Sequence, residues 1–211
     1  MHLHAQPASL HGWRLFCVLS VSVLIITALA LMAQPHTVEA LRSAIRVTAR
    51  TSLLLFLLTF LASSLAILLP SAFTRSLLRE RRFLGLAFAF SHAVHAVLII
   101  VYAKSFPDTF WHGRTAAANI PGSIGYFFIF LLTVTSFPAA VKRLGARTWK
   151  ALHSTGTWVI AGIFVVSFYK RIPMGSWYPL AFALIFSAIV FKLAAKLAVR
   201  LRRQARAEAS A

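Results

Sequence analysis

Three histidines lie inside long apolar stretches of this chain, at His92, His95 and His153. An ionisable side chain in a membrane-spanning stretch marks a functional site by default, because it must find a partner or a water-filled cavity. His92 and His95 are three residues apart in "FSHAVHAVLI", so a helix places both on one face, which must look into the protein. Neutral imidazole is a common axial ligand of haem iron. The three side chains therefore indicate either hydrogen bonds between helices or a haem held between them.

Other chemistry at these histidines has less support in the sequence. A zinc site is disfavoured because no carboxylate lies in an apolar stretch and the chain has a single cysteine, Cys17, although three imidazoles alone can hold the metal. A proton relay needs titratable groups across the layer, and the apolar stretches contain no Asp or Glu. No specific role is expected for the histidines of the N-terminal tail and the external loops, which are His2, His4, His11, His36 and His112.

The composition requires a membrane around these histidines. Of the 211 residues, 59% are hydrophobic and 12% are charged, whereas about a quarter of the residues in a soluble domain are charged. The excess of 22 Lys and Arg over 4 Asp and Glu lies in short clusters between apolar runs, not on a water-soluble basic face. These clusters are typical of lipid-headgroup and topology signals, so nucleic acid is not expected as a partner.

Six apolar runs have the length that a helix needs to cross a bilayer, about 20 residues. They predict an all-α membrane protein: a bundle of six transmembrane helices in a single domain, 1–211, with short cytoplasmic tails at 1–12 and 199–211. The first run is read as a retained span, because it lacks a convincing cleavage site for a signal peptide. The predicted spans are 13–33, 48–69, 83–103, 121–141, 151–169 and 177–198.

The basic clusters also predict an orientation. The tails and loops between the six predicted spans alternate between the two sides of the membrane. They place 15 Lys and Arg on the side that carries both termini and 7 on the other, so the positive-inside rule makes both termini cytoplasmic. The first external segment, "AQPHTVEALRSAIRVTAR", has apolar residues at helical spacing and is expected to lie along the membrane surface.

Two motifs resemble a known family. "RRFLGLAFAFSHAVH" in the third span and "RLGARTWKALH" at the start of the fifth are similar to the ferric-reductase-like transmembrane domain, and most similar to its bacterial MsrQ (YedZ) branch. The resemblance extends over roughly residues 35–170. It implies a haem b protein of the bacterial inner membrane, which carries electrons from a separate reductase or quinol to a periplasmic acceptor.

The resemblance also implies a ligand set. His95 matches the family's ligand in the third span, His153 matches the first histidine of the fifth span, and His92 is an addition. Where the family has a second histidine, 13 residues after the first, this chain has Val166. Two-haem members also have third-span histidines about 14 residues apart, but Leu78 and Arg81 stand 14 residues before His92 and His95. We therefore expect one haem, or none.

Depth in the membrane complicates the single-haem interpretation. His92 and His95 follow Arg82 by ten and thirteen residues, about 15 and 20 Å of helix, whereas His153 follows Arg147 by only six residues, about 9 Å. Two ligands of one iron must lie at similar height. A third helix that begins in the headgroup layer, or tilted helices, would reduce the difference. Depth favours His92 as the partner of His153 and the family register favours His95, so both remain candidates as metal ligands.

Basic residues at the expected cytoplasmic mouth complete the predicted cofactor site. Arg81, Arg82 and Arg147, with Lys150, could form charge-assisted bonds to haem propionates, although the positive-inside pattern alone would explain them. No residue is predicted to be catalytic. The chain has no Gly-rich nucleotide motif and no segment large enough for a flavin or nicotinamide domain, so an electron carrier of this kind needs a separate donor.

Two functional hypotheses follow from the sequence. The first is a b-type cytochrome that carries electrons across the membrane and is at most one subunit of an oxidoreductase. The second is a haemless scaffold or accessory subunit that keeps the bundle of the family; Val166 and the difference in depth favour it. A permease is disfavoured because the spans contain no broken helix or buried charge near the midplane.

Overall fold

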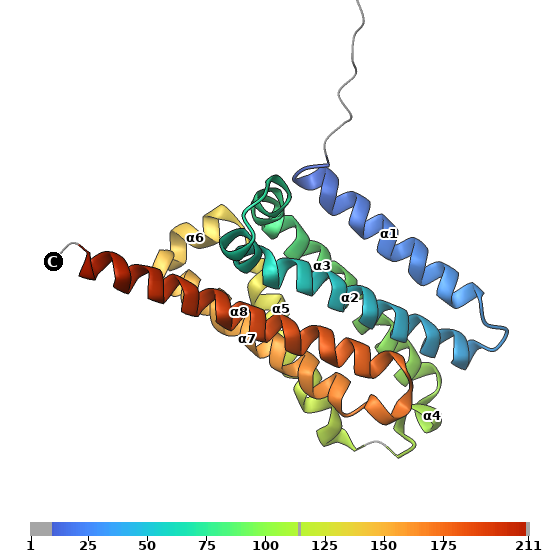
Figure 1. Cartoon of the computed structure of the whole chain (residues 1–211). Helices are drawn as coiled ribbons and strands as arrows, with labels where there is room; N and C mark the ends of the chain where they lie inside the picture. Colours follow the sequence, from blue (N-terminus) through green and yellow to red (C-terminus); the bar gives the residue numbers. More distant parts are fainter. Residues whose placement is uncertain (1–9, 114, 210–211) are drawn as a thin grey trace, which may run out of the picture.

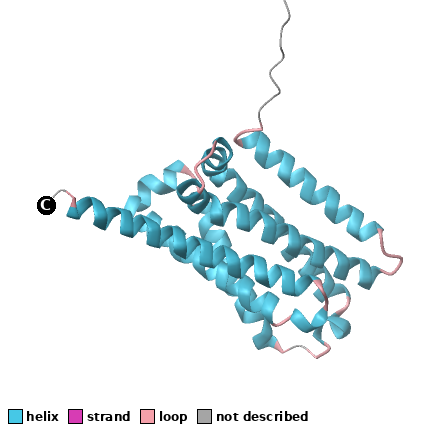
Figure 2. Cartoon of the chain, in the orientation of Figure 1, coloured by secondary structure: helices cyan, strands magenta, loops and turns pink. Residues whose placement is uncertain are grey.

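The chain is built from helices. The computed structural model describes residues 10–113 and 115–209, and within these ranges it contains no strand (Figure 2). Six helices are long and apolar enough to cross a membrane, which confirms the predicted six-helix class of multi-pass membrane protein. They are α1 (Trp13–Met32), α2 (Thr37–Leu68), α3 (Ala72–Ser105), α5 (Ile120–Val134) with the preceding 3-10 turn η1 (Ala116–Asn119), α7 (Ala146–Tyr169) and α8 (Trp177–Glu208).

Three shorter helices join the long ones: α4 (Pro107–Trp111), α6 (Pro138–Leu144) and the 3-10 turn η2 (Ile172–Met174). We call the end of the bundle with α6 and the α2–α3 connection the basic end, and the opposite end the α4 end (Figure 1). The predicted tails lie partly outside the described residues, at 1–9 and 210–211. The described part of the C-terminal tail continues α8 as helix to Glu208.

Local sequence explains where helices begin and end at the basic end. Ser71 caps α3, because its hydroxyl accepts from the Thr74 N–H while the Thr74 hydroxyl accepts from the Ser71 N–H. Pro138 has no N–H and disfavours helical backbone at Phe137, which is extended. Gly145, with φ of 74°, makes the turn from α6 to α7 that other residues adopt at a cost.

Pro138 also corrects one predicted boundary. The fourth span was expected to run over 121–141, but α5 ends at Val134 and α6 is a separate helix. The hydroxyls of Thr135 and Ser136 donate to the carbonyls of Leu131 and Leu132, which satisfies backbone acceptors at this helix end.

The first connection also differs from the expectation. Residues 37–50 do not form a separate surface helix but are the first turns of α2, which continues to Leu68. The reason is that this segment has a buried face: Leu41 and Ala44 pack against Leu98 and Tyr102 of α3. An apolar face of that kind serves equally well to contact a lipid surface or a neighbouring helix, so spacing alone did not distinguish them.

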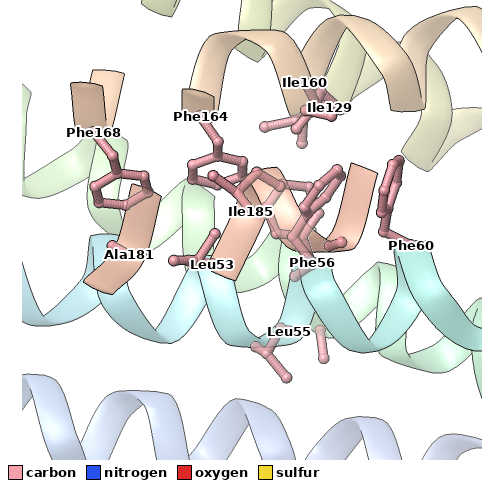
Figure 3. Packing of buried hydrophobic residues seen from close by; sticks show 14 of the residues in the cluster. Leu53, Leu55, Phe56, Phe60, Ile129, Ile160, Phe164, Phe168, Ala181 and Ile185 are labelled. Carbon is pink, nitrogen blue, oxygen red and sulfur yellow. The ribbon is translucent and has the colours of Figure 1, made fainter. Parts of the chain in front are cut away.

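The core lies where α2, α7 and α8 meet α3 and α5. Phe56 and Phe60 of α2 stack on each other, and Phe56 also contacts Phe164 of α7 (Figure 3). Ile185 of α8 is fully buried in the same cluster. These rings fill the centre of the bundle between the two ends. They therefore separate the polar side chains of the basic end from those of the α4 end.

Candidate functional site

His153 lies near the start of α7, at the basic end, and two contacts fix its ring. Its Nε2 is 3.0 Å from the Thr135 hydroxyl, and its ring stacks on Trp149 at 4.3 Å between centroids. The Trp149 indole N–H donates to the Thr135 carbonyl at 2.8 Å. All three residues are thus tied to the end of α5 that Pro138 creates.

The contacts of Thr135 are consistent with one tautomer of His153. A hydroxyl has one proton, and the Leu131 carbonyl lies 2.6 Å from the Thr135 hydroxyl oxygen. With that proton directed to Leu131, the hydroxyl oxygen accepts from the protonated Nε2 of His153. Nδ1 makes no hydrogen bond within the described part of the chain, so its lone pair is free to bind a metal or a donor. A fixed ring with one free lone pair is the arrangement that orients a histidine ligand.

His153 borders a cavity of about 490 Å³ at the basic end, formed by five helices: α2, α3, α5, α7 and α8. Aromatic side chains, among them Phe56, Phe88 and Trp158, form much of its wall. Among the residues that the structure describes, those that line the cavity and carry a charge are all cations, and none is a carboxylate. The cations are Arg81, Arg82, Lys150, Lys192 and Lys196. The site therefore combines one imidazole and apolar walls with a strongly positive potential, which suits a flat apolar ligand with acidic groups.

His92 and His95 lie together in a second polar cluster, on the other side of the phenylalanine core. Their rings are 5.2 Å apart between centroids. His95 Nδ1 is 2.9 Å from the Thr48 hydroxyl, and the Ala44 carbonyl lies 2.8 Å from the same hydroxyl. With the Thr48 proton directed to Ala44, Nδ1 donates to Thr48 and Nε2 has the free lone pair. His92 packs against Tyr126 at 5.0 Å, and its buried Nδ1 has no hydrogen-bond partner among the described residues.

The structure does not bring the two clusters together. The His92 ring contacts Phe164 of α7, which follows His153 by eleven residues, or about 16 Å of helix. Along α5, Tyr126 beside His92 and Thr135 beside His153 are nine residues apart, about 14 Å. The difference in depth expected from the sequence is therefore present. His92 and His95 follow the first residue of α3 by 20 and 23 residues, whereas His153 follows the first residue of α7 by seven.

These positions test the haem that the family implies. A clamp of one iron between His153 and either third-helix histidine does not fit, because the imidazoles differ in height by more than two helical turns. A haem held by His153 alone does fit its donor set, since a single axial imidazole is a common ligation and cations for two propionates surround the cavity. No group of three or more His, Cys, Asp or Glu that could hold a metal ion is present in residues 10–113 and 115–209.

The basic residues predicted for the cofactor site do not all line the cavity. Arg81, Arg82 and Lys150 line the cavity, whereas Arg147 is exposed and lies outside its lining. Lys192 and Lys196 also line the cavity, although the sequence predicted for them only a topology signal. Their i, i+4 spacing was a further signal, because it puts both lysines on one face of α8.

Comparison with known proteins agrees with this architecture. The model of the family "Ferric reductase like transmembrane component" matches residues 48–164, which include His92, His95 and His153. The magnetosome protein MamZ of Paramagnetospirillum magneticum is 33% identical over 115 residues, 52% of this chain and 18% of that protein. A probable ferric reductase transmembrane component of Eremothecium gossypii is 31% identical over 140 residues, 66% of this chain and 19% of that protein.

The matched part of the chain thus spans less than a fifth of the length of either relative. No solved structure matches this chain. Because the family model covers more than half of its length, from the middle of α2 to the last turns of α7, the chain belongs to the ferric-reductase-like transmembrane component family.

Proposed function

We propose that this chain is an electron-carrying haem b subunit of the MsrQ type in the bacterial inner membrane. Electrons would enter from a separate reductase or a quinol and leave to a periplasmic acceptor. The observation that carries the proposal is His153, an imidazole held by Thr135 at the edge of a cavity that five cations and no carboxylate line among the described residues. Membership of a ferric-reductase-like family supports it.

The residues of the cavity would hold the haem in complementary ways. His153 would donate its Nδ1 lone pair to the iron, with Thr135 fixing the ring through Nε2. Arg81 and Arg82 would neutralise propionates at the basic end. Phe56, Phe88 and Trp158 would exclude water from the ring faces. The bound haem supplies a one-electron carrier.

The direction of transfer rests on the orientation that the charge count predicts. If the basic end is cytoplasmic, the cavity lies on the donor side. His92, His95 and Tyr126 would then lie further toward the periplasmic side of the bundle than His153. No described segment outside the helices is long enough to bind a flavin or a nicotinamide, so the donor's own redox site lies outside residues 10–113 and 115–209.

A second function is favoured by the separation of the histidines. A haemless scaffold or accessory subunit would keep the bundle of the family and use His153 and His95 only as hydrogen-bond partners of Thr135 and Thr48. Bonds of this kind in membrane proteins contribute about 0.6 kcal/mol each. The scaffold would need neither a free imidazole lone pair nor an uncompensated group of cations around a cavity.

An absorption spectrum separates the two functions. The protein would be expressed with a haem precursor and purified in detergent. Its haem content would be measured by the pyridine haemochrome method against the protein concentration. The electron carrier predicts a Soret band, one haem b per chain and a spectral change with dithionite. A monodisperse, helical protein without a Soret band would refute the haem function and leave the scaffold.

A further inference from the structure

Lys192 occupies a position on α8 where an apolar side chain is expected. The buried residues of this helix follow one stripe at helical spacing: Ala181, Ile185, Ala188, Lys192 and Ala195. Only 9% of Lys192 is exposed, in contrast to Arg200 two turns later, which is exposed. Lys192 is therefore a core residue of the bundle and not one of the solvated cations that follow it.

The ammonium of Lys192 is turned inward and incompletely paired. Its Nζ donates to the Phe60 carbonyl at 2.6 Å and lies 4.4 Å from the centroid of the Phe60 ring. An ammonium has three N–H donors, and this is its one hydrogen bond to a described residue. None of the described carboxylates forms an ion pair with it. A buried charge without a counter-charge is destabilising, so the fold gains nothing evident from this lysine.

The same cavity that His153 borders also contains Lys192. Lys196, one turn further along α8, lies over the Trp158 ring at 4.9 Å and also lines the cavity. On the opposite wall, the Nε of Arg82 is buried without a hydrogen-bond partner in the described part of the chain. The Arg82 guanidinium lies over the Phe83 and Phe137 rings, which accept no conventional hydrogen bond. Arg82 on α3 and Lys192 on α8 thus line one cavity with donor capacity that the described residues leave unused, and an acceptor with negative charge would complete it.

We propose that Lys192 anchors a carboxylate of the ligand in this cavity, with the Phe60 carbonyl holding the ammonium in place. The inference rests on the proposed function, in which the ligand is haem and the carboxylate is a propionate. Lys192 is then a positioning residue that selects a ligand with acidic side chains. Its positive charge near the iron also stabilises the more electron-rich reduced form, so it raises the reduction potential.

A ligand without the carboxylates tests this role directly. Detergent-purified protein stripped of haem would be titrated with haem b and with haem dimethyl ester, for the wild type, Lys192→Met, Lys192→Arg and the control Arg200→Met. We expect Lys192→Met to weaken haem b binding about tenfold or more, the size expected for a hydrogen bond between charged groups, and to leave ester binding unchanged. Lys192→Arg should retain most of the preference for haem b, and Arg200→Met all of it.

Two further readouts separate this role from a structural one. Thermal unfolding of the haem-free protein should show Lys192→Met to be as stable as the wild type or more stable, because methionine fills a similar volume without a buried charge. The midpoint potential of the haem-loaded variant should be lower than that of the wild type. A lysine needed only for packing would instead lower the stability and leave the potential unchanged.

The outcomes distinguish the two proposals. If the wild type binds no haem, the proposed function fails and the role of Lys192 fails with it. If the wild type binds haem b and the ester equally, or if Lys192→Met keeps the full preference for haem b, only the role of Lys192 is overturned. Should Lys192→Met not fold, Lys192→Gln is measured in its place against the same criterion. Loss of bound phosphatidylglycerol from the variant with unchanged haem binding would assign the lysine to a lipid phosphate and also overturn the proposal.

Discussion

Substitution of the three histidines of the membrane-spanning helices tests the geometry most directly. His153→Ala, His92→Ala and His95→Ala would each be purified with haem and compared by optical and EPR spectroscopy. His153 lies about 16 Å along α7 from the position that His92 contacts, and one iron cannot meet imidazoles at both heights. We therefore expect a wild-type spectrum with one axial imidazole, lost in His153→Ala and retained in the other two variants.

The contacts of the His153 imidazole set the expected loss of haem affinity. Loss of a hydrogen bond that only orients a metal ligand lowers metal affinity about 10- to 100-fold, so Thr135→Val should weaken haem binding by that amount and His153→Ala by more. Thr48→Val removes the equivalent bond from His95 and should leave haem binding unchanged. A bis-histidine spectrum that disappears in both His153→Ala and His95→Ala would refute this reasoning, because it would require both imidazoles at one height.

Three other predictions concern the bundle itself. Ser52 and Ser91 are fully buried and 2.9 Å apart between α2 and α3; a double-mutant cycle with alanine should give a coupling free energy of about 0.6 kcal/mol, and one above ~1.7 kcal/mol would indicate a wider network. Gly156→Ala places a methyl group 3.1 Å from side chains of α5 and should lower the thermal unfolding midpoint, whereas Gly162→Ala on the same helix meets open space and should not. A reporter active only in the cytoplasm should work when fused to the C-terminus and fail near Asp108; the reverse result would invert the orientation.

Much of the fold could be predicted because the membrane restricts it. A stretch of about 20 apolar residues must be helical to satisfy its backbone in lipid, so span number and helix type follow from hydropathy alone. The positions of the helix ends could be predicted less reliably from the sequence. The fourth span looked continuous through 121–141 because Thr135 and Ser136 are tolerated in a helix, and the break depends on Pro138, whose effect on Phe137 is local.

The sequence predicted some residues that line the cavity, such as His153 and Arg81, but not how the candidate residues are arranged. Sequence spacing fixes heights along one helix, as for His92 and His95, but heights on different helices depend on where each helix enters the membrane. The hydrogen-bond partners of the histidines could not be predicted from the sequence either. Thr48 and Thr135 lie on α2 and at the end of α5, and only packing shows that the hydroxyl of each lies within hydrogen-bond distance of one histidine.

Lys192 illustrates why functional cations are hard to recognise in such sequences. The positive-inside rule explains every basic cluster near the expected cytoplasmic side, so a lysine that binds a ligand has the same sequence context as one that sets topology. The two differ in helical phase, because a topology signal can occupy any face of the helix. Lys192 follows the buried positions Ile185 and Ala188 at spacings of seven and four residues. A basic residue in phase with the apolar stripe of its own helix is therefore better explained by a buried anion than by topology.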